Sequence, residues 1–224
     1  MILRTILGIV CGWVIFQSQI SNVDKQNRTQ GESIINSREH GGEVLACDLP
    51  GAEMMKNIGS QVDGAGMCVM TSIELAARWQ GLEQYRGLRD WCAKFPGGAY
   101  PQKVDDQLKR FAREHHLPPP AYLQYEGAVP RPLLELCDKT GRMACITYGR
   151  GPRYQQRTIQ HMVCCPKFSQ RWGVVLDNNF PGVDNYEWMS LEELLNRMKW
   201  PSGQSWLFVW LEAAPSPIPH NLPH

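Results

Sequence analysis

The stretch QVDGAGMCVMTSIELAARWQG, residues 61–81, decides how this chain is interpreted. Within it a Gly-rich turn gives way to apolar residues at roughly helical spacing: Met70, Ile73, Leu75, Ala76, Ala77 and Trp79. The pattern predicts a helix that begins at Cys68. Unsatisfied backbone N–H groups and the positive end of the helix dipole favour a thiolate at such a position. Cys68 is therefore a candidate nucleophile.

A second segment, TIQHMVCCPKFSQRWGVVLDNNFPG at residues 158–182, supplies a histidine and an acid. Residues 158–165 and 172–177 are rich in β-branched and apolar side chains and are separated by a polar stretch, so they predict a hairpin. Antiparallel pairing would bring His161, near the start of one strand, beside Asp177 at the end of the next. A carboxylate or amide there would fix the imidazole tautomer and leave the other ring nitrogen facing a thiol.

Gln61 lies seven positions before Cys68, across the Gly-rich turn. Its amide could share an oxyanion with the backbone N–H of Cys68. The loop GRGPRYQQRTIQ, residues 149–160, directly precedes His161 and is expected to border the same site.

This order of residues resembles the papain-like cysteine peptidases, and more closely the C39-like branch, whose members cleave leader peptides at double-glycine sites. The resemblance covers about residues 46–212. It extends through an expected helix at 101–118, a strand around 141–146, a closing helix within 186–200 and a last strand at 205–211. It implies an α+β fold in which the nucleophile helix of a helical subdomain packs against an antiparallel sheet that carries the His and the Asp or Asn.

The chain departs from the family pattern at two places. The family usually has Asp-Pro after the last catalytic strand, whereas here Asp177 is followed by Asn178 and Asn179. Either Asp177 or Asn178 could orient the histidine. Papain has a Trp directly after its nucleophile, and here that residue is Val69.

The chemistry implied by the resemblance is thiol-dependent cleavage of peptide bonds in a peptide or protein substrate. His161 would take the thiol proton of Cys68, the thiolate would attack a carbonyl, and Gln61 with the Cys68 amide would hold the oxyanion. No metal or organic cofactor is required. Two alternatives stay open: a transglutaminase-like acyl transferase, which shares the order Cys, His, Asp, and a catalytically inactive papain-like binding module.

Composition is typical of a globular protein, with 224 residues of which 43% are hydrophobic. Lys plus Arg (23) nearly balances Asp plus Glu (22), which argues against nucleic acid as a partner. The eight cysteines contain no C-x-x-C pair, so a structural zinc site is not expected. Cys164 and Cys165 should point to opposite faces of a regular strand.

The N-terminal residues 1–20 place Arg4 before an apolar run of about twelve residues, which is the length of a signal-peptide core and too short for a spanning helix. We therefore expect export, with this segment either cleaved or retained as a membrane anchor. Residues 21–45 are polar and predict a flexible linker. Residues 46–213 form the expected peptidase domain, and the Pro-rich residues 214–224 a disordered tail.

Overall fold

The computed structural model describes residues 33–37, 42–46, 55–168, 170–180, 186–199 and 202–212. The expected signal or anchor segment (residues 1–20) and the tail (residues 214–224) lie outside these ranges. Strands β1 (Ser33–Ser37) and β2 (Gly42–Ala46) pair antiparallel, and all of their residues except Ala46 fall in the stretch expected to be a flexible linker, residues 21–45. Within the described ranges, no helix has both the length and the hydropathy needed to cross a membrane.

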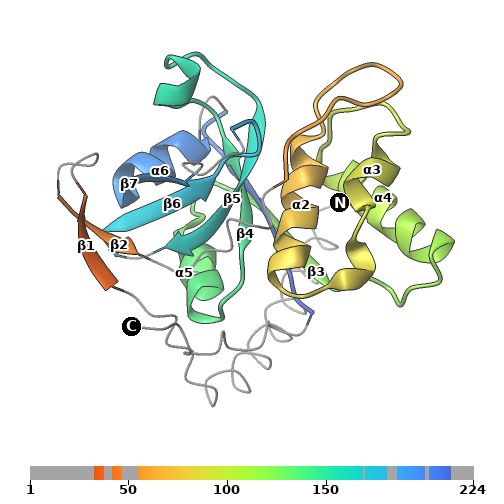
Figure 1. Ribbon diagram of the computed structural model, residues 1–224, viewed down its shortest axis with the longest axis horizontal. Coiled ribbons are helices and arrows are strands. Elements are labelled where there is room, and N and C mark those ends of the chain that lie inside the picture. The colour runs from red at the N-terminus through yellow and green to blue at the C-terminus, as the bar shows by residue number, and fades with distance from the viewer. Residues whose placement is uncertain are drawn as a thin grey trace.

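Six strands of the described residues form an antiparallel sheet in the order β3-β8-β4-β5-β6-β7 (Figure 1). Their bounds are β3 (Tyr122–Gly127), β4 (Ala144–Tyr148), β5 (His161–Phe168), β6 (Trp172–Leu176), β7 (Tyr186–Ser190) and β8 (Ser205–Trp210). The two strands that carry the candidate His and Asp, β5 and β6, are consecutive in the chain and adjacent in the sheet. The predicted hairpin is therefore confirmed.

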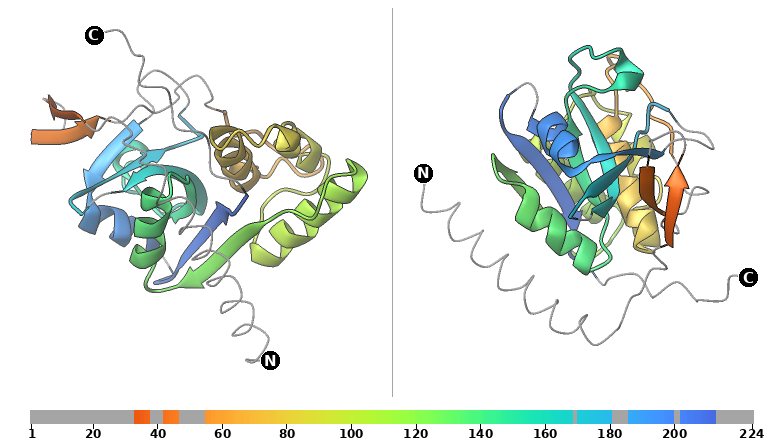
Figure 2. Two further views of the ribbon diagram at one scale, coloured as in Figure 1. Left: turned by 90° about the horizontal axis from the view of Figure 1, so that it is seen from below. Right: turned by 90° about the vertical axis from the view of Figure 1, so that its left-hand side faces the viewer.

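Helices cover both faces of this sheet, as Figure 2 shows from two further directions. The helical segments are α2 (Cys68–Trp79), η2 (Glu83–Tyr85), α3 (Leu88–Cys92), α4 (Pro101–Glu114), α5 (Arg131–Lys139), η3 (Pro152–Tyr154) and α6 (Leu191–Lys199). Buried residues of α2, α3 and α4 share one core with one sheet face, and those of α5 and α6 share another core with the opposite face. The coarse prediction of an α+β fold with an antiparallel sheet is confirmed, and so is a helix that begins at Cys68.

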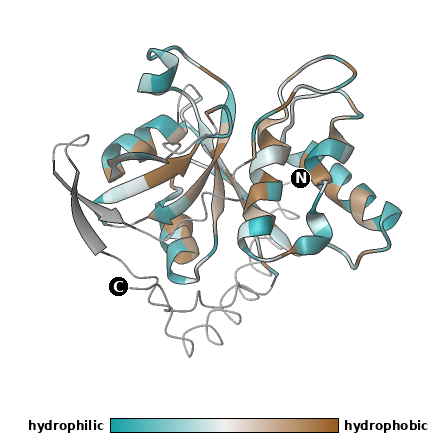
Figure 3. Ribbon diagram, in the orientation of Figure 1, coloured by the Kyte–Doolittle hydropathy of each residue, from teal (hydrophilic) through white to brown (hydrophobic). Residues whose placement is uncertain are grey.

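Alternation along the strands explains why the sheet is apolar on both sides. On β5, Cys164 belongs to the core under α2, whereas Cys165 belongs to the core under α5 and α6, as expected for neighbours in a regular strand. Figure 3 shows hydrophobic residues concentrated on the sheet, with hydrophilic residues on α4 and α6. A sheet buried on both faces cannot show the simple apolar–polar alternation of a half-exposed one, which is why these strands appear as continuous apolar runs in the sequence.

Two boundaries differ from the sequence-based expectation. Strand β5 continues to Phe168, into the stretch expected to be a polar turn, because Phe168 is buried and its backbone N–H donates to Asp138 Oδ1 over 3.2 Å. The Lys167 ammonium pairs with the same carboxylate at 3.1 Å. The closing helix α6 begins only at Leu191, since residues 186–190 form the edge strand β7.

Helix α2, which begins at the candidate nucleophile Cys68, is fixed to the sheet by polar contacts as well as by packing. The Trp210 indole N–H donates to the carbonyl of Ile73 over 2.9 Å, and the Trp210 ring stacks on Tyr85 with centroids 4.2 Å apart. The Cys164 thiol donates to the carbonyl of Ser72 over 3.3 Å. These contacts join α2 to β8 and β5, so the position of its first residue is set by the sheet.

The Glu74 carboxylate, on the buried side of α2, organises the next helix. Its oxygens accept from the Arg78 guanidinium at 2.6 Å and from the backbone N–H groups of Gly87 at 3.0 Å and Arg89 at 2.8 Å. Those N–H groups belong to the start of α3, where backbone donors have no partner inside the helix. Glu74 therefore joins α3 to α2.

Replacement of Glu74 by Ala should lower the free energy of unfolding by about 1–3 kcal/mol, because it leaves the partly buried N–H groups of Gly87 and Arg89 without acceptors. Urea denaturation followed by Trp fluorescence measures this change. Glu83→Ala is the matched control: it removes a carboxylate that pairs with Arg86 at the surface, so the effect should be much smaller. Equal losses in the two variants would contradict this role for Glu74.

Candidate active site

A short hairpin delivers Cys68 to the start of α2. Gly59 and Gly66 form an antiparallel bridge, and the Met67 N–H donates to the carbonyl of Ile58 over 2.8 Å. Gly64 has a φ of 70°, a conformation that side chains with a Cβ rarely adopt, and it lies in the turn that reverses the chain. The chain therefore doubles back before Cys68, and residue 57 arrives level with residue 68.

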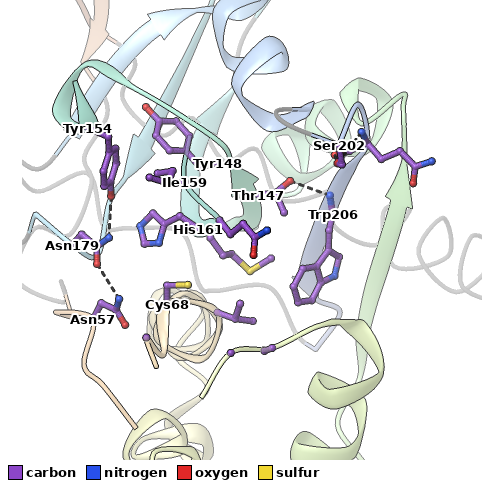
Figure 4. Close-up of a pocket in the computed structure, with 17 residues that line it drawn as sticks. Asn57, Cys68, Thr147, Tyr148, Tyr154, Ile159, His161, Asn179, Ser202 and Trp206 are labelled. Atoms are coloured by element: carbon purple, nitrogen blue, oxygen red, sulfur yellow. Dashed lines mark hydrogen bonds between the residues drawn. The ribbon is translucent and has the colours of Figure 1, made fainter. Parts of the chain in front are cut away.

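Cys68, His161 and Asp177 lie together in the structure. His161 is the first residue of β5, and its Nε2 lies 2.8 Å from Oδ1 of Asp177, which directly follows β6. The Cys68 thiol lies beside the imidazole, near enough for each group to shift the pKa of the other. Because the carboxylate accepts the Nε2 proton, Nδ1 is the ring nitrogen left for the thiol. Figure 4 shows the Cys68 and His161 side chains close to each other at the cleft.

Electrostatics in this set favour an ion pair. Burial alone would raise the pKa of the Cys68 thiol, but the hydrogen bond and charge of His161, together with the backbone N–H groups of Met162 and Val69, bring this pKa below its ordinary value. Burial opposes the charge of His161, yet its hydrogen bonds with Asp177 and Cys68 raise the His161 pKa to about 9. Both shifts favour thiolate and imidazolium near neutral pH.

Asp177 is held by more than the histidine. Burial would raise the pKa of its carboxyl, but the hydrogen bonds from His161 and Tyr154 and from the Asn179 backbone lower it overall. The Tyr154 hydroxyl donates to Oδ2 over 2.7 Å, and the Asn179 N–H donates to Oδ1 over 2.9 Å. The carboxylate is inaccessible to solvent. These donors keep it ionised and fix its orientation toward the imidazole.

Asn178, the alternative orienting residue, occupies a different place. Its amide nitrogen donates to the carbonyl of Cys68 at 3.2 Å, to Oγ of Ser72 at 3.0 Å and to the carbonyl of Met162 at 3.0 Å. Asn178 thus ties the first turn of α2 to β5. The side chain hydrogen-bonded to His161 is that of Asp177.

The structure does not bring Gln61 to the thiol. Gln61 is exposed in the turn at the far end of the hairpin, where its backbone N–H donates to the carbonyl of Ala93 over 2.7 Å. A spacing of seven positions suggested proximity to Cys68, but the hairpin sends residues 60–65 away from its base. The expected placement of Gln61 is corrected accordingly. The amide at the base of the hairpin belongs to Asn57.

A cleft of about 660 Å³ opens above the thiol (Figure 4). Its described walls carry no Asp, Glu, Lys or Arg side chain. The residues around it are Asn57, Gly66, Cys68, Val69, Gly98, Ala99, Thr147, Tyr148, Tyr154, Ile159, Gln160, His161, Met162, Asn179, Ser202, Gln204 and Trp206. Tyr154, Ile159 and Gln160 come from the loop at 149–160, so the expectation that this loop borders the site is confirmed. Among the described residues, no group of three or more His, Cys, Asp and Glu side chains could hold a metal ion.

One wall of the cleft is held against the Cys68 hairpin by two charged residues. The Asp63 carboxylate accepts from the Gly97 N–H at 2.9 Å and from the Ala65 N–H at 3.0 Å. The Lys103 ammonium donates to the carbonyls of residues 96, 97 and 98 at 2.6, 3.1 and 2.7 Å. Gly97 packs so closely on Ala65 that there is no room for a Cβ. The neighbouring Gly98 and Ala99, which line the cleft, are therefore held in place.

Sequence reasoning missed Asn57, Tyr154 and Asn179 as members of the site. Tyr154 lies in the loop expected near the cleft, and Asn179 lies in the turn after Asp177. Their positions along the chain therefore indicated that both lie near the site, but not what either side chain contacts. For Asn57 the signal was only the run of glycines between it and Cys68. That run favours a tight reversal but does not fix which residues end up opposite each other.

Comparisons with known proteins add one distant similarity. No protein-family model matches the chain. No curated protein matches it either. Among solved structures, the chain is similar to the crystal structure of a double glycine motif protease from an AMS/PCAT transporter in complex with the leader peptide. The identity is 16%, the TM-score is 0.35, and the match covers 70% of this chain and 94% of that one.

Asp177→Asn should lower the pKa of His161 below its value of about 9, because the substitution removes the negative charge that stabilises the imidazolium. In the wild type the imidazolium persists as pH rises until about 9, and in the variant it should be lost at a lower pH. An NMR titration of the His161 ring measures both. Asp90→Asn, an exposed carboxylate on α3, is the control and should leave the titration unchanged. A His161 that titrates at the same pH in all three proteins would refute this electrostatic role for Asp177.

Proposed function

We propose that this chain is a cysteine peptidase, distantly related to the papain-like and C39-like enzymes, that cleaves peptide bonds through Cys68, His161 and Asp177. The observation that carries the proposal is the Cys68 thiol at a helix N-terminus, beside an imidazole whose Nε2 lies 2.8 Å from a buried carboxylate. Nucleophile, base and orienting acid are then in the relation that acyl transfer requires. The open cleft above the thiol leaves space for a peptide chain.

The first half of the reaction forms a thioester. The Cys68 thiolate attacks the carbonyl carbon of the scissile peptide, and the carbonyl oxygen becomes an oxyanion at the N-terminus of α2, where backbone N–H groups and the helix dipole stabilise it. The tetrahedral intermediate collapses as the His161 imidazolium gives its Nδ1 proton to the leaving nitrogen. The amine product leaves, and the acyl group stays on sulfur.

The second half releases the acyl group. The neutral His161 removes a proton from water, and the resulting hydroxide equivalent attacks the thioester carbonyl. Collapse of the second tetrahedral intermediate expels the Cys68 thiolate and restores the imidazolium beside it. Throughout, Asp177 keeps the proton on Nε2 and holds the ring plane toward the sulfur. Each residue returns to its starting state after one hydrolysis.

Two features support a peptide as the substrate. The cleft is open, and its described walls combine apolar and neutral polar side chains, which suits an extended chain with uncharged groups near the cleaved bond. We also propose that the enzyme is exported, on the basis of the apolar run within residues 1–20. That segment lies outside the described residues. An exported thiol enzyme would act on peptides or proteins beyond the cytoplasm.

The purified full chain should hydrolyse members of a random library of quenched-fluorescent hexapeptides, and Cys68→Ala and His161→Ala should each abolish the cleavage. Mass spectrometry of the products gives the cleaved bond. Cys92→Ala is the control, because Cys92 is a free thiol buried in the core and should be dispensable for turnover.

Three other results would contradict this assignment. Incorporation of a fluorescent alkylamine into glutamine peptides, in place of hydrolysis, would favour a transglutaminase-like transferase. Binding of library peptides without any turnover would favour an inactive binding module. Cleavage that survives Cys68→Ala would show that another group, or a contaminant, does the chemistry.

A further inference from the structure

We infer that Asn57 is the side-chain donor of the oxyanion hole, an inference that rests on the proposed peptidase function. Acyl transfer at Cys68 needs a second N–H beside the backbone donors at the start of α2. The residue expected from spacing, Gln61, lies at the far end of the hairpin. Asn57 lies at the hairpin base and borders the same cleft as the thiol.

The hairpin ladder places Asn57 next to Cys68. With Gly59 opposite Gly66, and the Met67 N–H bonded to the carbonyl of Ile58, the next pair along the ladder is residues 57 and 68. The Asn57 backbone N–H donates to the carbonyl of Asn178 over 2.7 Å, and the Asn178 amide donates to the carbonyl of Cys68. One residue therefore anchors both the donor and the nucleophile, which holds them in fixed relation.

A chain of hydrogen bonds that starts at the catalytic carboxylate fixes the orientation of the Asn57 amide. Ionised Asp177 can only accept, so the Tyr154 hydroxyl donates to it at 2.7 Å. The phenol oxygen then accepts from Nδ2 of Asn179 at 3.0 Å, which leaves the Asn179 Oδ1 to accept from Nδ2 of Asn57 at 2.9 Å (Figure 4). Each step allows only one direction of donation, and the last step directs Nδ2 of Asn57 toward Asn179, which borders the same cleft.

The two ends of the Asn57 amide differ in what they can do. Its Oδ1 is buried and has no hydrogen-bond partner among the described residues. Its Nδ2 uses one hydrogen in the exposed bond to Asn179 and carries a second. A buried acceptor left unpaired is uncommon in folded proteins and calls for an explanation. The hydrogen bond to Asn179 explains this one, because it holds the amide with Oδ1 inward and leaves the second Nδ2 hydrogen available to a developing oxyanion.

Asn179 acts on this donor indirectly and is a positioning residue. Its side chain sets which way the Asn57 amide faces, and its backbone N–H bonds Asp177. The acid of the triad and the oxyanion donor are thereby connected through the turn at residues 177–179. Substitution of Asn179 should release the Asn57 amide without touching the thiol or the imidazole.

The test compares Asn57→Ala, Asn57→Asp and Gln61→Ala on the best-cleaved hexapeptide and on the aldehyde that carries its acyl-side sequence. Attack of Cys68 on the aldehyde forms a tetrahedral adduct whose oxygen occupies the oxyanion position. Asn57→Ala should lower kcat on the order of 10²- to 10³-fold with KM little changed, and should weaken aldehyde binding to a similar degree. Asn57→Asp retains the shape but has no N–H, so its loss should be at least as large. Gln61→Ala and Asn196→Ala, an exposed asparagine on α6, should behave as wild type.

A double variant tests the positioning role of Asn179. Asn179→Ala should lower kcat by less than Asn57→Ala does, and the double variant should lose no more than Asn57→Ala alone, since the amide that Asn179 orients is then absent. Full additivity of the two losses would refute this role.

The possible failures can be told apart. A wild type that cleaves peptides, with Asn57→Ala unaffected and Gln61→Ala impaired, would overturn the assignment of Asn57 and leave the peptidase standing. A rise in KM at constant kcat in Asn57→Ala would also overturn it, because it would place Asn57 in ground-state binding. A wild type that cleaves no library peptide and forms no thioester with any of them at Cys68 would overturn the proposed function, and the inference with it.

Discussion

The amide of Asn178 is the contact on which the rest of the site depends. Three segments far apart in the chain, namely the first turn of α2, strand β5 and the turn after β6, meet at this one buried side chain. Its backbone carbonyl also accepts from Asn57, so the hairpin before Cys68 is included. The junction adds to the direct hydrogen bonds between α2 and β5, in which the Ser72 hydroxyl donates to the carbonyl of Met162 over 3.0 Å and the Cys164 thiol donates to the carbonyl of Ser72. Acyl transfer tolerates little misplacement of the reacting groups, so a fixed junction of this kind is what the proposed chemistry needs.

The fold and the site were predictable from the sequence to different degrees. The helix that begins at Cys68 and the β5–β6 hairpin follow from local pattern, because glycine turns, helical spacing and β-branched runs act over short distances. The choice between Asp177 and Asn178 depends on the β5–β6 register, which shifts between Cys164 and Lys167 in a way that no pattern of residue types reveals. Gln61 was misplaced for a related reason. In a hairpin, a residue farther away along the chain can lie closer in space. Asn57, eleven positions before Cys68, therefore lies nearer to it than Gln61, which is seven positions before.

The loop at 149–160 shows how strain and polarity combine beside the site. Gln155 and Gln156 have φ values of 54° and 59°, a left-handed conformation that is unfavourable for residues with a side chain. The Arg157 N–H donates to the carbonyl of Tyr154 over 3.0 Å, closing a tight turn that presents the Tyr154 hydroxyl to Asp177. Below the loop, Tyr148 is held by Glu187 at 2.9 Å and by the Arg197 guanidinium at 2.5 Å, so the base of the loop is rigid. The surrounding structure thus stabilises a backbone conformation that is unfavourable on its own, and the result is a third hydrogen bond to the Asp177 carboxylate.

The central claim is that Cys68 exists as a thiolate paired with the His161 imidazolium, and alkylation with iodoacetamide across pH 4 to 9 tests it most directly. The cysteine is half-buried at the cleft, whereas the other described thiols are buried in the cores. Modified residues are mapped by mass, with His161→Ala as the control. We expect rapid labelling confined to Cys68 well below the ordinary cysteine pKa of about 8.5, and loss of that labelling in the variant. Labelling of Cys68 that rises only near that pKa, and equally in both proteins, would contradict the ion pair and the active enzyme it supports.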